Sequence, residues 1–295
     1  MASRAEAVTA GMDATRIASR LAENASMEIG SPDLAELAEA GDYLRPGQQI
    51  FVSHLPGQTW NRTFQICSGI SAAGFEPVPH IPVRLLESAK HLDGILRAAH
   101  DVGVREPLLI SGDYPEARGP FESVIQVLRA GALQARGMRR VSLAGHPEGH
   151  PRVPWDVICQ AQVDKWRQAK AAGLAVTFVT QFFFSPEPFV QWARFLRAAG
   201  VDARLLAGIA GPTHLGRLIK LAKHCGVGAS IRALTSRRAS LMGLLGDHDP
   251  KALLLDLAAE KLRQDALFDG VHVFSLGGFK RAARWLRECH PQQTT

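Results

Sequence analysis

The chain has 295 residues and 46% of them are hydrophobic, so it can bury a sizeable core and is not a disordered protein. It carries 34 Lys and Arg against 28 Asp and Glu, a formal net charge of +6, and its basic residues are scattered along the sequence. Because a nucleic-acid surface needs clustered basic residues, we expect small anionic molecules as partners and no nucleic acid.

The first 24 residues contain no apolar run long enough for a signal peptide or a membrane span. They are typical of a frayed segment followed by an amphipathic helix. We therefore predict an N-terminal helical extension over residues 1–24, no membrane partner and a cytoplasmic location. Four cysteines lie far apart without a CxxC pair, which is typical of reduced core cysteines: Cys67, Cys159, Cys225 and Cys289.

From residue 25 onward, short apolar runs alternate with longer stretches of helical periodicity. The predicted strands are 25–30, 49–56, 76–83, 106–113, 139–147, 175–184, 202–210 and 270–278. Eight such units favour a closed parallel barrel over an open sheet, and no GxGxxG follows a strand. We predict an α/β fold with a single (β/α)8 TIM barrel over residues 25–295, carrying a helical insertion at about 229–268.

The functional site of such a barrel forms at the carboxyl ends of its strands. Polar residues or glycines end each predicted strand, and their convergence predicts a binding site: Glu28, His54, His80, Asp113, His146 with Glu148 and His150, Gln181, Gly208 with Gly211, and Ser275. Glu28 stands between two apolar residues, so we expect an inward carboxyl with a raised pKa, as a general acid requires.

Three further residues invite a chemical interpretation. Asp113 follows Gly112, which permits close backbone approach, and serves either as a site carboxylate or as a turn residue. Gln181 can donate and accept hydrogen bonds at once, which suits a pterin or amide ligand. The aromatic residues 182–184 that follow it are expected to pack in the core and at the lip of the barrel.

The stretch LAGHPEGHP, residues 143–151, places two histidines and a glutamate close together. Prolines in this stretch prevent a helix that would align His146 with His150 as metal ligands. A metal-dependent barrel hydrolase stays open as an alternative, because His54, His80 and Asp113 could supply ligands from other strand ends. We nevertheless expect no metal, and interpret the two histidines as hydrogen-bonding residues of the site.

Eight segments, taken in their order along the chain, resemble methylenetetrahydrofolate reductase: ASMEIGSP, FVSHLPG, PVPHIPVR, LLISGDYP, AGHPEGHP, VTQFFF, LLAGIAGP and GVHVFSL. The resemblance covers roughly residues 25 to 290, the catalytic barrel without the regulatory domain of the eukaryotic enzymes. It implies an enzyme of one-carbon metabolism that reduces 5,10-methylenetetrahydrofolate to 5-methyltetrahydrofolate, with NADH or NADPH as the hydride donor.

The resemblance also implies roles for individual residues. Glu28 falls on the catalytic glutamate that protonates N10 and opens the imidazolidine ring. Asp113 falls on an aspartate that lies near the pterin, contacts the folate and takes part in catalysis by adjusting the electrostatics of the reacting pair. Gln181 falls on a glutamine that binds the folate. Phe183 beside it and Lys280, which could hold the folate's glutamate tail, complete the candidate folate contacts. Gly277 and Gly278 replace a polar pair often seen after the last strand.

The candidate cofactor contacts are His54, His80, Gly112, His146 and His150, of which His80, Gly112 and His150 keep flavin positions of the family. Other flavin positions diverge, since the usual threonine, arginine, tyrosine and lysine are replaced by Leu55, Ser111, His146 and Ala169, with Lys165 and Lys170 as substitutes for the lysine. Each charge-assisted bond lost to a diphosphate is worth about 1.5–3 kcal/mol.

We therefore expect FAD to be absent or weakly held, with nicotinamide and folate exchanging hydride directly. A conventional FAD-dependent reductase and a folate-binding protein without turnover remain alternatives. The sequence does not decide between NADH and NADPH, and a homo-oligomer is left open.

Overall fold

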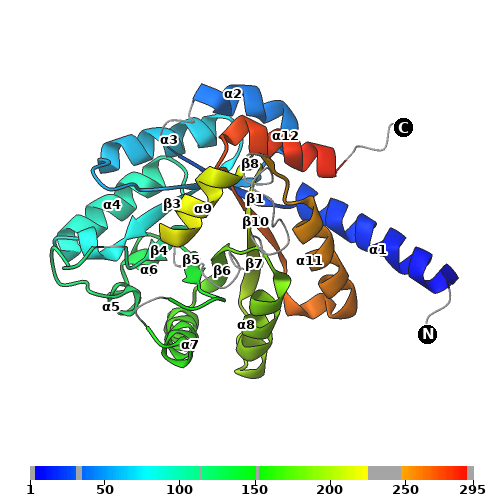
Figure 1. The fold of residues 1–295 in the computed structure, drawn as a ribbon. Helices are drawn as coiled ribbons and strands as arrows, with labels where there is room; N and C mark the ends of the chain where they lie inside the picture. The colour runs from blue at the N-terminus through cyan, green and yellow to red at the C-terminus, as the bar shows by residue number, and fades with distance from the viewer. Residues whose placement is uncertain (1–3, 31–34, 113, 151–152, 225–246, 291–295) are drawn as a thin grey trace.

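The computed structural model describes residues 4–30, 35–112, 114–150, 153–224 and 247–290. Eight parallel strands close into one barrel in the order β1-β10-β7-β6-β5-β4-β3-β2, which confirms the predicted single (β/α)8 TIM barrel (Figure 1). The barrel strands are β1 (Ser26–Ile29), β2 (Gln49–Val52), β3 (Glu76–Pro82), β4 (Leu108–Ile110), β5 (Arg140–Gly145), β6 (Ala175–Phe182), β7 (Arg204–Ala210) and β10 (Gly270–Phe274).

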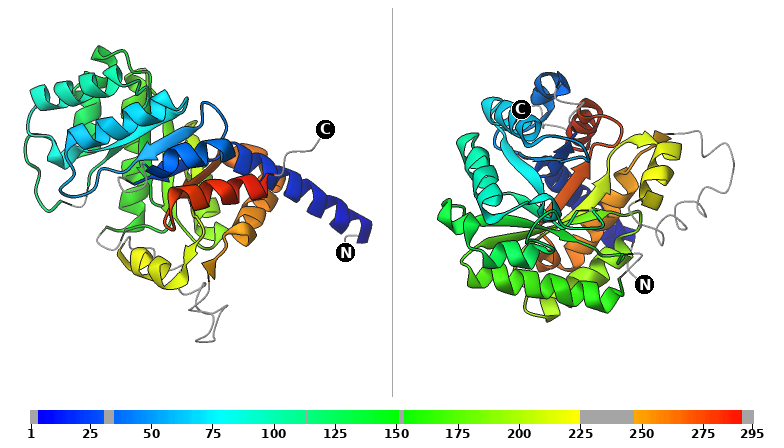
Figure 2. Two further views of the ribbon diagram at one scale, coloured as in Figure 1. Left: turned by 90° about the horizontal axis from the view of Figure 1, so that it is seen from above. Right: turned by 90° about the vertical axis from the view of Figure 1, so that its left-hand side faces the viewer.

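Helices surround this barrel on its outer side (Figures 1 and 2). They are α1 (Arg4–Glu23), α2 (Glu36–Ala40), α3 (Trp60–Ala72), α4 (Ala89–Asp101), α5 (Val124–Arg129), α6 (Ala132–Ala135), α7 (Trp155–Ala171), α8 (Pro186–Ala198), α9 (Leu215–His224), α11 (Lys251–Arg263) and α12 (Phe279–Cys289). A two-stranded antiparallel sheet of β8 (Thr213–His214) and β9 (Asp247–His248) lies outside the barrel.

The barrel is filled by side chains and is not a pore. Apolar residues from five strands pack together inside it: Phe51, Val78, Leu108, Val179 and Leu206. A second, larger cluster lies between the strands and the helices. The strands are buried on both faces, which explains why their sequences are near-continuous apolar runs.

Local signals set the helix boundaries. Thr59 begins α3 and Ser88 begins α4, because each side chain accepts a hydrogen bond from a backbone N–H of the first turn. The helical stretch between β4 and β5 is divided into α5 and α6 at Gly131. Gly131 has a φ of 67°, which is left-handed and interrupts the helix.

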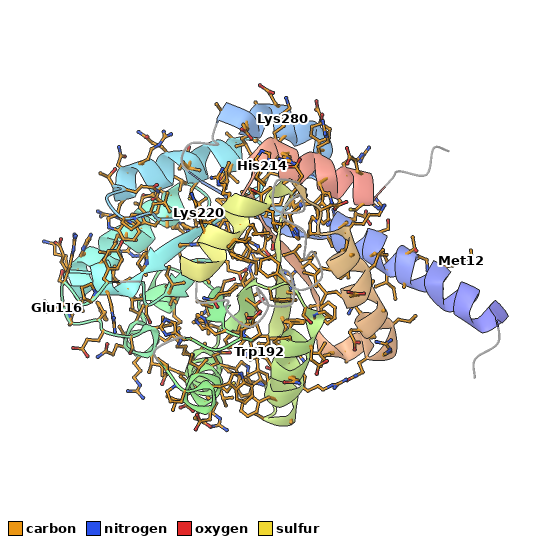
Figure 3. All side chains as sticks on the ribbon, in the orientation of Figure 1. Met12, Glu116, Trp192, His214, Lys220 and Lys280 are labelled. Carbon is orange, nitrogen blue, oxygen red and sulfur yellow. The ribbon has the colours of Figure 1, made fainter. Side chains whose placement is uncertain are left out.

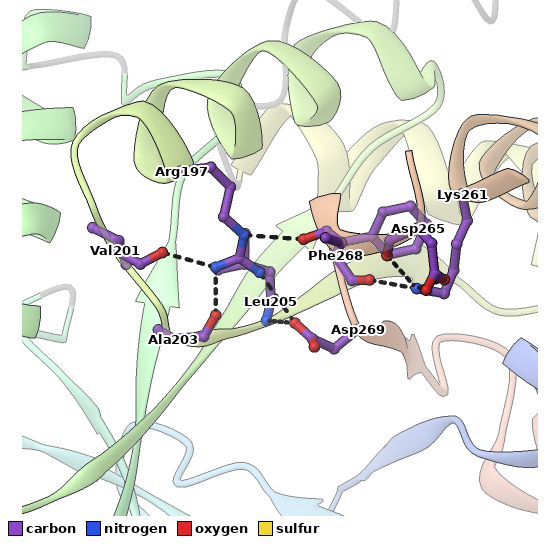
Figure 4. A network of polar contacts seen from close by, with 9 residues as sticks. Arg197, Val201, Ala203, Leu205, Lys261, Asp265, Phe268 and Asp269 are labelled. Atoms are coloured by element: carbon purple, nitrogen blue, oxygen red, sulfur yellow. Dashed lines mark hydrogen bonds and ion pairs between the residues drawn. The ribbon is translucent and has the colours of Figure 1, made fainter. Parts of the chain in front are cut away.

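The amino-terminal end of the barrel is held by partly buried polar contacts. Figure 4 shows a network in which the Arg197 guanidinium donates to the carbonyls of Val201 and Ala203, at 2.9 and 2.7 Å, and to Asp269. The Asp269 carboxylate also accepts from the backbone N–H of Leu205 at 2.8 Å. These bonds join the starts of β7 and β10 at the face that, in such barrels, serves stability.

Helix α1 lies within the predicted N-terminal extension and packs on α11 and α12 through Ala18, Leu21 and Ala22. Its amino-terminal half projects from the barrel, where Met12 is 71% exposed (Figures 1 and 3). Residues 229–246 of the predicted helical insertion lie outside the described residues, while α11 forms its later part. Among the described helices, none combines the length and apolar character that crossing a membrane requires.

Candidate active site

The site is built around Glu28 at the carboxyl end of β1. Its neighbours in register are Phe51 of β2 and Phe274 of β10, which places its side chain inside the mouth of the barrel. The Ser53 hydroxyl donates a hydrogen bond of 2.5 Å to Oε1 of Glu28. The Ser275 hydroxyl donates to the Glu28 backbone carbonyl. Ser53, which follows β2, thus fixes the carboxyl of Glu28, and Ser275, which follows β10, fixes its backbone.

Two imidazoles approach the other carboxylate oxygen. Nε2 of His80 lies 3.6 Å and Nε2 of His272 lies 3.7 Å from Oε2 of Glu28. Ser26 holds His272 from behind, with its Oγ 2.9 Å from Nδ1. His272 was not among the residues that the sequence predicted for the site. The available signal was a single histidine within the apolar strand GVHVF.

The pKa of Glu28 differs from the raised pKa that the sequence led us to expect. Burial acts to raise the pKa of Glu28, but the charge of His80, the close approach of His272 and the hydrogen bond from Ser53 outweigh it and lower that pKa to about 2. The pKa of His80 is lowered by burial, against the opposing effect of Glu28. Because His80 attracts the carboxylate only while it is protonated, the acidity of Glu28 depends on the protonation of His80.

An apolar surface borders the carboxyl on the side of β6 and β10. Its buried base is formed by Phe182, Ala210, Leu215 and Leu218. Five partly buried residues pack against this base: Phe184, Ile219, Leu221, Phe274 and Leu276. The Phe182 and Phe274 rings meet edge to face with centroids 5.6 Å apart. Phe274 is partly exposed and neighbours Glu28 in register. Such a surface suits the flat face of an aromatic or pterin ring.

Gln181 stands at an irregularity near the end of β6. The register with β7 changes between Val179 and Phe182, so that one extra residue bulges out of the ladder. The Thr180 hydroxyl stabilises this bulge, because it accepts from the backbone N–H of Gly208 at 2.8 Å and donates to the Gln181 carbonyl at 2.9 Å. Bulges beside active sites re-aim side chains, and Gln181 is partly exposed at the carboxyl end of its strand.

His54 is occupied by contacts within the protein. Its Nδ1 lies 2.8 Å from Oγ1 of Thr63, and its ring stacks on Trp60 with centroids 4.1 Å apart. Burial, with the nearby charge of His80, lowers the pKa of His54 to about 4. These contacts explain a histidine at this position without a cofactor.

Acid should destabilise the fold through His54. Above pH 6.5 this ring is neutral in both states, but between pH 6.5 and 4 the unfolded chain binds a proton that the folded chain excludes. The free energy of unfolding should therefore fall by at most about 3 kcal/mol as the pH drops through that window. Urea unfolding at several pH values measures this fall, which should be shallower in His54→Gln. Parallel profiles for the two proteins would contradict the assignment.

Phe183 and Lys280, predicted as folate contacts, are engaged elsewhere. Phe183 is fully buried and stacks on Phe189 of α8, with centroids 5.3 Å apart. The Lys280 ammonium pairs with Glu39 of α2 on the outer side of the barrel (Figure 3). Neither contact involves a residue of the barrel mouth.

The remaining predicted contacts lie in loops at the carboxyl ends of β4 and β5. Gly112 has a φ of 84°, and a Cβ there would lie 2.8 Å from the Tyr114 ring, so only glycine fits. The rings of His146 and His150 meet edge to face with centroids 6.4 Å apart. Asp113 lies outside the described residues.

The residues present fit a flavin diphosphate poorly. Ala169, at the position where the resemblance implies a lysine, is fully buried in the core. Of the two substitutes, Lys170 is paired with Asp202 on the surface, and Lys165 is partly buried with a pKa lowered by that burial. A buried alanine cannot replace the charge-assisted bond of a lysine to a phosphate.

A metal site is equally poorly supported by the geometry. Within the described ranges, no three His, Cys, Asp or Glu side chains are grouped so that they could hold a metal ion. His54 turns its Nδ1 to Thr63, and Glu28 is bonded to Ser53. The described members of the predicted ligand set are therefore not grouped as a metal site, while Asp113 lies outside the described residues.

Comparison with known proteins agrees with this geometry. The sequence model of the family "Methylenetetrahydrofolate reductase" matches residues 35–239, more than half of the chain. The 5,10-methylenetetrahydrofolate reductase of Salmonella typhimurium is 26% identical over 275 residues, which cover 90% of each chain. The enzymes of that name from Pectobacterium carotovorum and Escherichia coli are each 28% identical, over 68% and 63% of this chain and 67% and 64% of theirs.

The match of the family model and the barrel that carries Glu28 at its mouth lead to one assignment. The chain belongs to the methylenetetrahydrofolate reductase family, of which it contains the catalytic region, and it is an oxidoreductase.

Proposed function

We propose that this protein reduces 5,10-methylenetetrahydrofolate to 5-methyltetrahydrofolate, with NADH or NADPH giving its hydride directly to the folate and no FAD bound between them. The observation that carries the proposal is the fixed carboxyl of Glu28 in the barrel mouth of a chain of this family. The positions of Asp113 and Gln181 agree with folate contacts by resemblance only.

The reaction needs an acid and a stabilised cation. Glu28 acts as this acid when it carries a proton, a state that loss of the positive charge on His80 favours. Proton transfer from Glu28 to N10 then opens the five-membered ring and leaves a cationic N5 iminium, whose methylene carbon accepts the hydride. The carboxylate that remains stabilises this cation, because it lies in a water-poor site where charges interact strongly. The apolar surface around Phe274 would support the pterin ring beside Glu28, and Gln181 would hydrogen-bond its edge.

Direct hydride transfer is supported by the loss of charged residues at the flavin positions of the family. Ala169 is buried in the core and carries no charge, Lys170 is paired with Asp202, and burial lowers the pKa of Lys165, which disfavours its charged form. Arg84, another cation near the mouth, donates to the carbonyls of Tyr114 and Glu122 and thereby braces the loops after β3 and β4. If no flavin relays the hydride, nicotinamide and folate must occupy the mouth together.

The purified protein should therefore lack the visible absorption of a stoichiometric flavin. It should oxidise NADH or NADPH when methylenetetrahydrofolate is added, and supplementing FAD should change the rate by less than about twofold, since no step would pass through it. The measurement is the fall in nicotinamide absorbance with and without folate and with and without FAD. Stoichiometric flavin, or turnover only after FAD is added, would refute direct transfer and leave the conventional reductase.

A further inference from the structure

The reaction proposed above consumes one proton in each turnover, and the following inference rests on that proposed function. Once Glu28 has given its proton to N10, the carboxylate needs another proton before the next substrate can react. We propose that His80 returns this proton, acting through Glu28 and not on the folate, while His272 holds the carboxylate in place.

The geometry distinguishes the two imidazoles. Nε2 of His80 is buried 3.6 Å from Glu28 and has no hydrogen-bond partner among the described residues. The His80 side chain is 13% exposed, whereas that of His272 is 1% exposed. His272 is also fixed by Ser26 and enclosed by the rings of Phe51 and Phe274. A proton from water can therefore reach His80 more readily than His272.

The separation of 3.6 Å is longer than a hydrogen bond of 2.7–3.2 Å. Bonds of this kind are often long in ligand-free enzymes and shorten when substrate binds. A shift of about 0.5 Å, or one bridging water molecule, would connect the two groups.

The charges around the pair also favour proton exchange. The groups that bear on it from the neighbouring strands are Ser53, His54 and His272. Burial and the nearby His272 lower the pKa of His80, and only the negative charge of Glu28 opposes them. When His80 loses its proton, Glu28 loses the attraction that lowers its own pKa. The protonation states of the two groups are therefore coupled, as a relay requires.

The proposed step transfers one proton from His80 to Glu28. The Nε2–H bond of the His80 imidazolium breaks and its electron pair stays on nitrogen, while an O–H bond forms at Oε2 of Glu28. The neutral imidazole then takes a proton from solvent. No oxidant or reductant is needed, because the hydride of the reduced nicotinamide supplies the only electron pair that the folate gains.

A His80→Gln variant tests this role kinetically. We expect kcat to fall about 100-fold while KM for methylenetetrahydrofolate changes by less than about threefold, because proton return is impaired and folate contacts are not. Added imidazole should restore part of kcat in this variant but not in Glu28→Gln. His100→Gln, the same change in an exposed residue of α4, serves as the control and should behave as the unmodified protein. Unchanged kcat, or a loss that imidazole leaves untouched, would overturn the relay.

A titration of the His80 ring by NMR tests the pairing without turnover. In Glu28→Gln the pKa of His80 should be lower than in the unmodified protein, because the carboxylate that raises it is gone. An unchanged titration would overturn the proposal. If the protein fails to reduce the folate yet the titration shifts as expected, the proposed function is wrong and the coupled pair stands.

Discussion

Replacing Glu28 by glutamine is expected to lower folate-dependent oxidation of NADH or NADPH by about a thousandfold or more. The amide can still accept the hydrogen bond from Ser53, so the loop after β2 should keep its position. It cannot give a proton to N10, and positioned acids contribute about 10²- to 10⁴-fold to such reactions. Folate affinity should stay within about threefold of the original, since an interaction needed only in the transition state has been removed.

Two measurements decide the outcome for Glu28. Steady-state rates give the loss in kcat, and equilibrium titration with folate gives the affinity of the inactive variant. Glu288→Gln, an exposed carboxylate in the last turn of α12, is the matched control and should retain full activity. If Glu28→Gln turns over normally, the acid is another group. If affinity and rate fall together, Glu28 binds the folate and does not protonate it.

The barrel could be predicted from sequence because short apolar strand segments alternate with longer segments of helical hydrophobic periodicity. Each strand is a short apolar run and each helix a longer amphipathic one, so eight units can be counted before any contact is known. Strand ends were less well predicted: the run 49–56 forms a strand only to Val52. The residues that follow, including Ser53 and His54, belong to the loop that surrounds the mouth, and their apolar neighbours do not show where the ladder ends.

The site could be predicted only where a residue's place along one strand was sufficient. Glu28 and His80 end the first and third predicted strands, and the structure brings them together across the barrel mouth. His272 is different, since its role depends on closure of the barrel, which pairs β10 with β1 and sets His272 beside Ser26. The raised pKa expected for Glu28 was wrong for the same reason: the imidazoles that lower it come from β3 and from β10, far away in sequence.

Substituting Gly208 by alanine should destabilise the fold by roughly 3 kcal/mol, because a side chain there has no room. A Cβ at this position would lie 2.5 Å from the backbone carbonyl oxygens of both Thr180 and Gln181. These atoms belong to the bulge of β6 and cannot rotate away as a side-chain end would. Either the bulge or β7 must move, so the position of Gln181 should be lost together with stability.

Gly94→Ala is the matched control for this change. Gly94 lies in α4 and a Cβ there meets nothing within 4 Å, so alanine should raise the free energy of unfolding by about 0.5–1 kcal/mol. Chemical unfolding of both variants shows whether the free energy of unfolding falls in Gly208→Ala and rises in Gly94→Ala. Folate titration of Gly208→Ala tests whether the bulge still positions Gln181. Equal stability of Gly208→Ala and the original protein would show that β6 and β7 separate easily. Lost stability with full folate affinity would show instead that Gln181 does not need the bulge to act.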